Sequence, residues 1–250
     1  MKTLVLTIII LLGSLASATA QDFYLPSSSK SRKAVKVMHE AAELFGNVHI
    51  AEGNAKIDQA LALDPNLFMA HVYAIQYAPK DAKNTLIDKA LAIDIKNFNE
   101  AEKIMRNLLE NWQKDPKYNA AEEMKALVAA YPNTPQALEW ASLHAFYTEK
   151  NLEAGLDYAQ KLVKMSANYA PNYNTMGYAY MQKKEMDKAK AALEKYIALA
   201  PKEPNAYDSM GEFYMNNEDY PKSAEYYDKA VAMGLDSAKE RAEKARAMIK

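Results

Sequence analysis

The stretch YNTMGYAY at residues 173–180 returns 34 residues later as YDSMGEFY at residues 207–214. Both copies place a methionine, Met176 or Met210, directly before a glycine, and a tyrosine three positions after that glycine. Residues three and four apart lie on the same face of an α-helix, so each copy predicts a helix with one packed face. A repeat of this length indicates a fold that stacks one small helical unit.

A second helical stretch follows each copy. It carries a small residue, Ala189 or Ser223, and a bulky residue four positions later, Leu193 or Tyr227. A small side chain lets a neighbouring helix approach closely, and the glycine of the first helix has the same effect. Pro201 then follows an apolar helix end, and proline cannot continue a helix. The sequence therefore predicts helical hairpins separated by prolines.

This unit, with Tyr173, Met176, Gly177 and Tyr180 in its first helix and a small-x3-bulky second helix, resembles the tetratricopeptide repeat (TPR) family. The resemblance implies a stack of helical hairpins that binds another protein. Residues 205–214 also resemble the TPR tails of some exported bacterial serine hydrolases and esterases. The hydrolase domain itself is missing, so the resemblance implies no catalysis.

Weaker copies of the pattern precede the strong pair, and Pro65 and Pro132 follow apolar helix ends as Pro201 does. The predicted array covers 32–236, with the two best-matched repeats in 170–236. Its units are 32–66, 67–95, 97–133, 135–168, 171–203 and 204–236. A count of five, with 67–133 as one irregular region, stays open.

Residues 237–250 are predicted to form a capping helix that begins at Ser237 and turns a charged face to water. The predicted fold is therefore all-α. It is a right-handed superhelix of about six TPR-like helical hairpins with a C-terminal capping helix.

The first twenty residues are typical of a signal peptide. Lys2 precedes an apolar run at 4–12, and small residues stand before Gln21. The run is too short for a ~30 Å hydrocarbon core, which argues against the alternative of an uncleaved anchor. We expect residues 1–20 to be removed, 21–31 to form a flexible entry segment, and the mature protein to be periplasmic or secreted.

Composition and charge argue against several classes of function. The 31 basic and 32 acidic residues nearly balance, which gives no electrostatic case for nucleic acid or an anionic membrane. The chain has no cysteine, and this fits a bacterial periplasm or exterior. The sequence contains no phosphate-binding glycine loop, no nucleophile elbow and no metal-binding histidine pair. We therefore expect no enzyme, no cofactor, no metal site and no membrane insertion of the mature chain.

The resemblance to TPR proteins places the binding groove on the first helices, between the packing positions. In the two strong copies this stripe comprises Asn174, Tyr178, Met181, Asp208, Glu212 and Met215. The weaker copies contribute Met38, Ala42, Phe45, Val72, Gln76, Leu138, Ser142 and Ala145. The groove is thus apolar toward the amino end and acidic toward the carboxyl end. A peptide or helix with apolar anchors and a basic end would complement it.

One subclass of TPR proteins grips a carboxylate terminus with Lys and Asn on this groove. Here Tyr178 replaces the expected asparagine and Asp208 has the wrong charge, so a carboxylate clamp is not expected.

The predicted function is an exported, non-enzymatic TPR scaffold that binds a protein or peptide segment in its concave groove. Two alternatives stay open. The groove tyrosines could stack against a small molecule or glycan, or residues 67–133 could pair with a second copy, which leaves a homo-oligomer open.

Overall fold

The computed structural model describes residues 23–249, so the expected signal peptide and residues 21–22 lie outside the described part of the chain. All regular structure within 23–249 is helical. The helices of the first three hairpins are α1 (Arg32–Gly46), α2 (Ile50–Leu63), α3 (Phe68–Tyr77), α4 (Lys83–Leu91), α5 (Glu100–Lys114) and α6 (Ala121–Ala130). They are followed by α7 (Pro135–His144), α8 (Leu152–Met165), α9 (Ala170–Gln182), α10 (Met186–Leu199), α11 (Pro204–Asn216), α12 (Tyr220–Ala232) and α13 (Ala238–Ala247). A short 3₁₀ turn, η1 (Ile95–Asn97), precedes α5, and a π-helical turn, η2 (Ala145–Glu149), prolongs α7.

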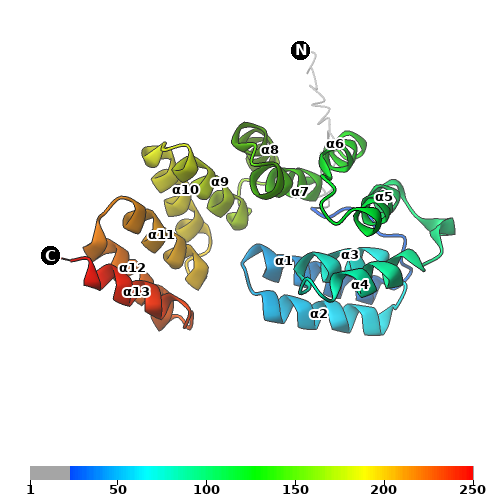
Figure 1. Ribbon diagram of the computed structural model, residues 1–250, viewed down its shortest axis with the longest axis horizontal. Coiled ribbons are helices and arrows are strands. Elements are labelled where there is room, and N and C mark those ends of the chain that lie inside the picture. Colours follow the sequence, from blue (N-terminus) through cyan, green and yellow to red (C-terminus); the bar gives the residue numbers. More distant parts are fainter. Residues whose placement is uncertain (1–22, 250) are drawn as a thin grey trace, which may run out of the picture.

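Consecutive helices pair as six hairpins, from α1–α2 to α11–α12, and α13 packs against α12. The hairpins follow an arc, with α1–α4 in one arm and α9–α13 in the other (Figure 1). Residues 67–133 form two hairpins, α3–α4 and α5–α6, and not one irregular region. The predicted all-α fold of about six hairpins with a capping helix is confirmed. None of the helices in 23–249 combines the length and the apolar character that a membrane span requires.

Prolines mark the ends of three second helices. Pro65, Pro132 and Pro201 each stand two residues after the last residue of α2, α6 and α10. Each proline disfavours helical geometry at the residue before it, so the helix ends at that point. The start of α5 is fixed in a different way, because Asn99 and Glu102 exchange side-chain to backbone hydrogen bonds in a capping box.

Glycines allow the two helices of a hairpin to touch. A Cβ on Gly177 would lie 2.6 Å from Leu193 Cδ2, and a Cβ on Gly211 would lie 2.7 Å from Tyr227 Cδ1. The bulky residue of each second helix therefore fills the space that a side chain would need on the first helix. Ser223, the small residue of α12, donates from Oγ to the carbonyl of Gly211 at 2.9 Å.

The segment before α1 has no regular structure, but a buried leucine and several backbone hydrogen bonds attach it to the helices behind it. Leu25 is 2% exposed, and its backbone N–H donates to Gln136 Oε1 at 2.7 Å. The carbonyl of Phe23 accepts from the N–H of Gln136 at 3.0 Å. The N–H of Ser28 donates to Glu102 Oε1 at 2.9 Å. The segment thus runs along the amino-terminal ends of α7 and α5.

The capping helix α13 is held by apolar and ionic contacts. Ala238, Ala242 and Ala245 are buried against α12. Arg241 Nη2 lies 2.7 Å from Asp208 Oδ1 on α11. Ser237 precedes α13 but makes no capping hydrogen bond, because its Oγ instead accepts from Arg241 Nη2 at 3.5 Å.

The turn between α1 and α2 reaches across the concave side to the opposite arm. His49 Nε2 lies 3.0 Å from Glu203 Oε2, at the start of α11. A Cβ on Gly46 would lie 2.8 Å from Tyr169 Oη and 3.2 Å from Pro171 Cγ, at the start of α9. In a simple solenoid each repeat contacts only its neighbours. Here the first hairpin also contacts the fifth and sixth, so the arc closes on itself.

Candidate binding site on the concave side

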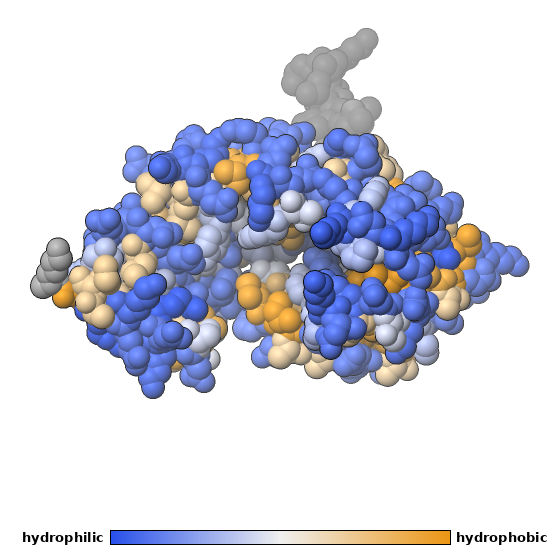
Figure 2. Space-filling model, viewed as in Figure 1, coloured by the Kyte–Doolittle hydropathy of each residue, from blue (hydrophilic) through white to orange (hydrophobic). Residues whose placement is uncertain are grey.

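A cavity of about 550 Å³ lies on the concave side of the arc. The first helices of five successive hairpins, α1, α3, α5, α7 and α9, supply most of its lining. The space-filling view shows a hollow between the two arms, with apolar side chains at its edge (Figure 2). Ligand sites typically have this size and are concave and mostly apolar.

Aromatic side chains form one wall of the cavity. The rings of Phe45 and Tyr77 stack with centroids 3.8 Å apart and an interplanar angle of 11°. Tyr73 stacks on Phe45 at 5.8 Å and meets Trp140 edge to face at 5.5 Å. These contacts hold the rings in fixed positions, so the wall presents rigid aromatic surface at a low cost in side-chain entropy.

One acidic side chain, Glu139 of α7, is set into this apolar lining. Its Oε1 accepts a hydrogen bond from the hydroxyl of Tyr169. Burial raises the pKa of the Glu139 carboxyl to about 7, although the bond from Tyr169 works in the opposite direction. No basic side chain of the described residues contributes to this pKa. The carboxyl group therefore changes charge near neutral pH.

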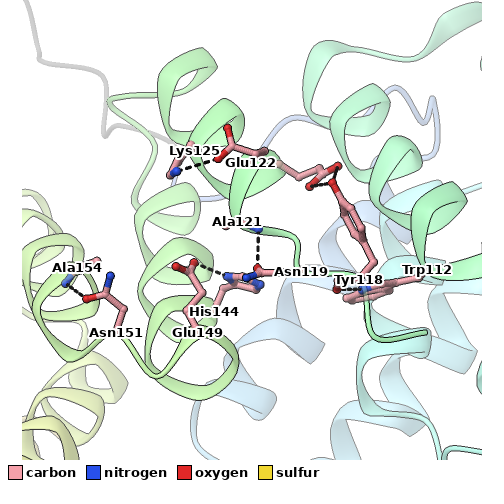
Figure 3. Close-up of polar contacts among 11 residues, drawn as sticks. Trp112, Tyr118, Asn119, Ala121, Glu122, Lys125, His144, Glu149, Asn151 and Ala154 are labelled. Atoms are coloured by element: carbon pink, nitrogen blue, oxygen red, sulfur yellow. Dashed lines mark hydrogen bonds and ion pairs between the residues drawn. The ribbon is translucent and has the colours of Figure 1, made fainter. Parts of the chain in front are cut away.

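Two buried polar atoms of the lining have no hydrogen-bond partner among the described residues. They are Nε2 of His144 and Oδ1 of Asn174. The other ring nitrogen of His144, Nδ1, lies 3.0 Å from Glu149 Oε1. Figure 3 shows these two side chains and the contact between them. Buried polar atoms are nearly always satisfied, so two orphan atoms in one cavity point to a ligand that supplies their partners.

The π-helical turn η2 shapes one side of the cavity. It continues α7 beyond His144 and brings Tyr147 and Thr148 into the lining. Lys150 then adopts a left-handed conformation with φ of 57° and ends the turn. This turn accommodates residues that exceed the length of the strong repeats, and π-helical turns are frequent at functional sites.

The predicted stripe of the weaker repeats divides between the cavity and the core. Asn174 lines the cavity together with Ala42, Phe45, Val72, Gln76 and Ser142. Met38, Leu138 and Ala145 instead are buried, with exposed fractions of 3% or less. On α7, Glu139 and Leu143 line the cavity in place of Leu138 and Ala145.

The stripe of the two strong repeats lies outside this cavity apart from Asn174. Tyr178, Met181 and Glu212 border a second, shallower hollow, in which the Tyr178 hydroxyl donates to Glu212 Oε2 at 2.8 Å. Asp208 is only 9% exposed and pairs with Arg241. Met215 packs on the core cluster of α12 and α13. The two acidic residues of the predicted stripe, Asp208 and Glu212, thus have partners within the chain.

Several cavity residues were not predicted from the sequence, among them Glu139, Tyr77, Trp112, His144 and Tyr169. Figure 3 shows Trp112, whose Nε1 donates to the carbonyl of Tyr118 at 3.2 Å. A single acidic residue inside the apolar stretch ALEWASL was a usable signal for Glu139. The position of Tyr169, which precedes its helix, follows only from the contact between the two arms.

Comparisons with known proteins agree with this architecture. Residues 170–203 and 204–233 match the family model of the tetratricopeptide repeat. Over 85% of its length the chain is similar to a chain of the APC/C hetero-tetramer Cut9-Hcn1, at 14% identity and a TM-score of 0.55, and it spans 42% of that chain. Over 80% of its length it is similar to PilW, a widely conserved type IV pilus biogenesis factor, at 13% identity and a TM-score of 0.50, and it spans 93% of that chain. No curated protein matches the chain. At these identities the structural likenesses show the fold alone.

Proposed function

We propose that this protein is an exported, non-enzymatic scaffold that binds a segment of a partner protein in its concave groove. The observation that carries the proposal is the cavity lined by the first helices of five hairpins. Helical-repeat folds of this kind commonly mediate contacts between proteins. A cavity of about 550 Å³ has room for one or two anchoring side chains of a bound segment.

The binding energy would come from few contacts. Anchoring side chains that enter well-packed, desolvated pockets dominate protein interfaces. The aromatic wall of Phe45, Tyr73 and Tyr77 supplies such a pocket. The second hollow, with Tyr178, Met181 and Glu212, would extend the groove along the bound segment toward the carboxyl end.

A cavity-filling variant tests the proposal. Ala42 borders the cavity, and Ala42→Phe would occupy the space that a ligand needs. Ala62 is exposed on α2, so Ala62→Phe is a matched control that adds the same side chain outside the cavity. Thr175→Phe, on the opposite wall, is a second cavity variant that keeps the test possible if Ala42→Phe does not fold. Circular dichroism would establish that each variant is folded.

Cross-linking and co-purification from the native cell envelope would then show which proteins bind. We expect a partner to be captured by the wild type and Ala62→Phe, and to be lost with both cavity variants. A partner that folded Ala42→Phe and Thr175→Phe retain would overturn the assignment of the cavity. Export is tested by sequencing the amino terminus of the protein from that fraction, with Gln21 as the expected first residue.

A further inference from the structure

The cavity offers hydrogen-bond acceptors that lack donors. Tyr169 donates to Oε1 of Glu139, and no described residue donates to Oε2. Oδ1 of Asn174 is buried and unpaired. When Nδ1 of His144 carries the proton and donates to Glu149, Nε2 is also an acceptor. The group that fills this space must therefore bring hydrogen-bond donors.

The aromatic wall is suited to a positive charge. Lysine and arginine groups are attracted to the faces of aromatic rings, and the attraction is larger where water is excluded. The charge of Glu139 acts on the Tyr73, Tyr77 and Tyr169 hydroxyls and contributes, after burial, to the raised pKa of each of them. Glu139 lines the same cavity as this wall and bonds to Tyr169, so a cation on the rings would also be attracted to its carboxylate.

Within residues 23–249, no cationic side chain occupies this position. Lys83 borders the cavity, but its Nζ donates to the carbonyl of Gln76 at 3.5 Å, and it forms no ion pair with Glu139 in the described part of the chain. A carboxylate that is partly removed from water and has no counter-ion is costly, and a cation that binds beside it reduces that cost.

We infer that the segment bound in the cavity carries a lysine or arginine side chain, with Glu139 as its counter-ion and Asn174 and His144 as further acceptors. This inference rests on the proposed function. The aromatic wall surrounds the aliphatic part of that side chain, and apolar residues on either side of it contact the rest of the lining.

A peptide library tests the inference. Each peptide carries lysine, arginine, norleucine, glutamine or glutamate at its centre, between randomised apolar flanks. Norleucine matches the length of lysine without its charge. The immobilised wild type would be compared with Glu139→Gln, and with Glu194→Gln as a control for a glutamate exposed on α10. Ala42→Phe gives the background of peptides held outside the cavity.

We expect the wild type and Glu194→Gln to enrich lysine and arginine peptides about tenfold over norleucine peptides. Glu139→Gln should still retain apolar peptides but lose this preference. Preference for norleucine or glutamate, or an unchanged preference in Glu139→Gln, would overturn the inference while the proposed function stands. If the wild type retained every peptide only as weakly as Ala42→Phe does, the result would count against the proposed function itself.

The two tryptophans give an independent readout. The chain contains only Trp112 and Trp140, and both line the cavity. An enriched lysine peptide should therefore change the tryptophan emission of the wild type, and should change that of Glu139→Gln only at about tenfold higher concentration. An unchanged emission at saturation would place the peptide elsewhere and overturn the inference.

Discussion

At the scale of single residues, Glu139 is an acidic side chain set among the aromatic residues that line the cavity. Its carboxyl group is half-buried among aromatic rings, and one tyrosine hydroxyl is its hydrogen-bond donor. Perturbed carboxyl groups of this kind are frequent at binding sites, and the role proposed for Glu139 as a counter-ion agrees with this.

Glu139→Gln should change how stability depends on pH. The pKa of the folded carboxyl is raised to about 7 from an ordinary 4.5, so the native state keeps a proton that the unfolded chain releases between these values. The free energy of unfolding of the wild type therefore falls as the pH rises through this window, by about 3 kcal/mol. Glutamine does not titrate and can still accept from Tyr169.

Urea unfolding of both proteins near pH 5 and near pH 8 measures this difference. The variant should gain stability relative to the wild type at the higher pH. Equal pH dependence of the two proteins would show that the carboxyl group has an ordinary pKa in the native state.

Gly177→Ala should destabilise the fifth hairpin by about 1–3 kcal/mol, because the new Cβ would overlap Leu193 Cδ2. A double-mutant cycle with Leu193→Ala identifies the cause. Removal of the leucine side chain makes room for the Cβ, so the double variant should be more stable than the sum of the single effects predicts. If the two substitutions had additive effects on thermal stability, the destabilisation by Gly177→Ala would have a cause other than this contact.

At the scale of elements, α13 closes the open end of the array. It covers the apolar face of α12, and Arg241 compensates the buried carboxylate of Asp208 on α11. Burial raises the pKa of Asp208, and the guanidinium group opposes this shift. The capping helix therefore neutralises a charge that would otherwise remain buried.

Arg241→Ala should destabilise the last hairpin by about 1–3 kcal/mol, because it leaves Asp208 buried without its partner. Arg246→Ala is the matched control on the same helix. Its pair with Asp228 is exposed on both sides, so its loss should change stability little. The stability of the two variants can be compared by chemical denaturation, with hydrogen exchange of α11–α13 as the probe. Equal losses of stability in Arg241→Ala and Arg246→Ala would contradict the role given to Arg241.

At the scale of the whole molecule, the closure of the arc sets the shape of the site. The turn between α1 and α2 contacts Tyr169 and Glu203 on the opposite arm. The cavity lies between the two arms that this contact joins. Tyr169 belongs to both features, because it approaches Gly46 and donates to Glu139. The contact that closes the arc and the hydrogen bond that positions Glu139 thus involve the same tyrosine.

Gly46→Val should separate the two arms. Its side chain would meet Tyr169 and Pro171, where even a Cβ is too close. The chain has no cysteine, so cysteines introduced at the exposed positions Glu52 and Lys202 can carry a pair of fluorescent labels. Energy transfer should report a longer and broader label distance in Gly46→Val. Ala51→Val, at an exposed position of α2, is the control and should leave the label distance unchanged. An unchanged distance in Gly46→Val would show that this contact does not hold the arms together.

The sequence by itself determined the helical hairpins, because the spacing of Gly177, Gly211 and the prolines acts through neighbouring residues. Local packing and helix termination need no knowledge of distant parts of the chain. It also placed Ala42, Phe45, Val72, Gln76, Ser142 and Asn174 on the surface that forms the cavity.

Only the tertiary structure decided where that surface closes. The meeting of Gly46 with Tyr169 depends on small rotations between successive hairpins, which add up along the array and leave no trace in any single repeat. Glu139 meets Tyr169, and Asp208 meets Arg241 of α13, through the packing of neighbouring units, which the repeat pattern did not specify. A local pattern fixes which residues pack within a hairpin, whereas the accumulated geometry of six hairpins fixes which residues meet across the groove.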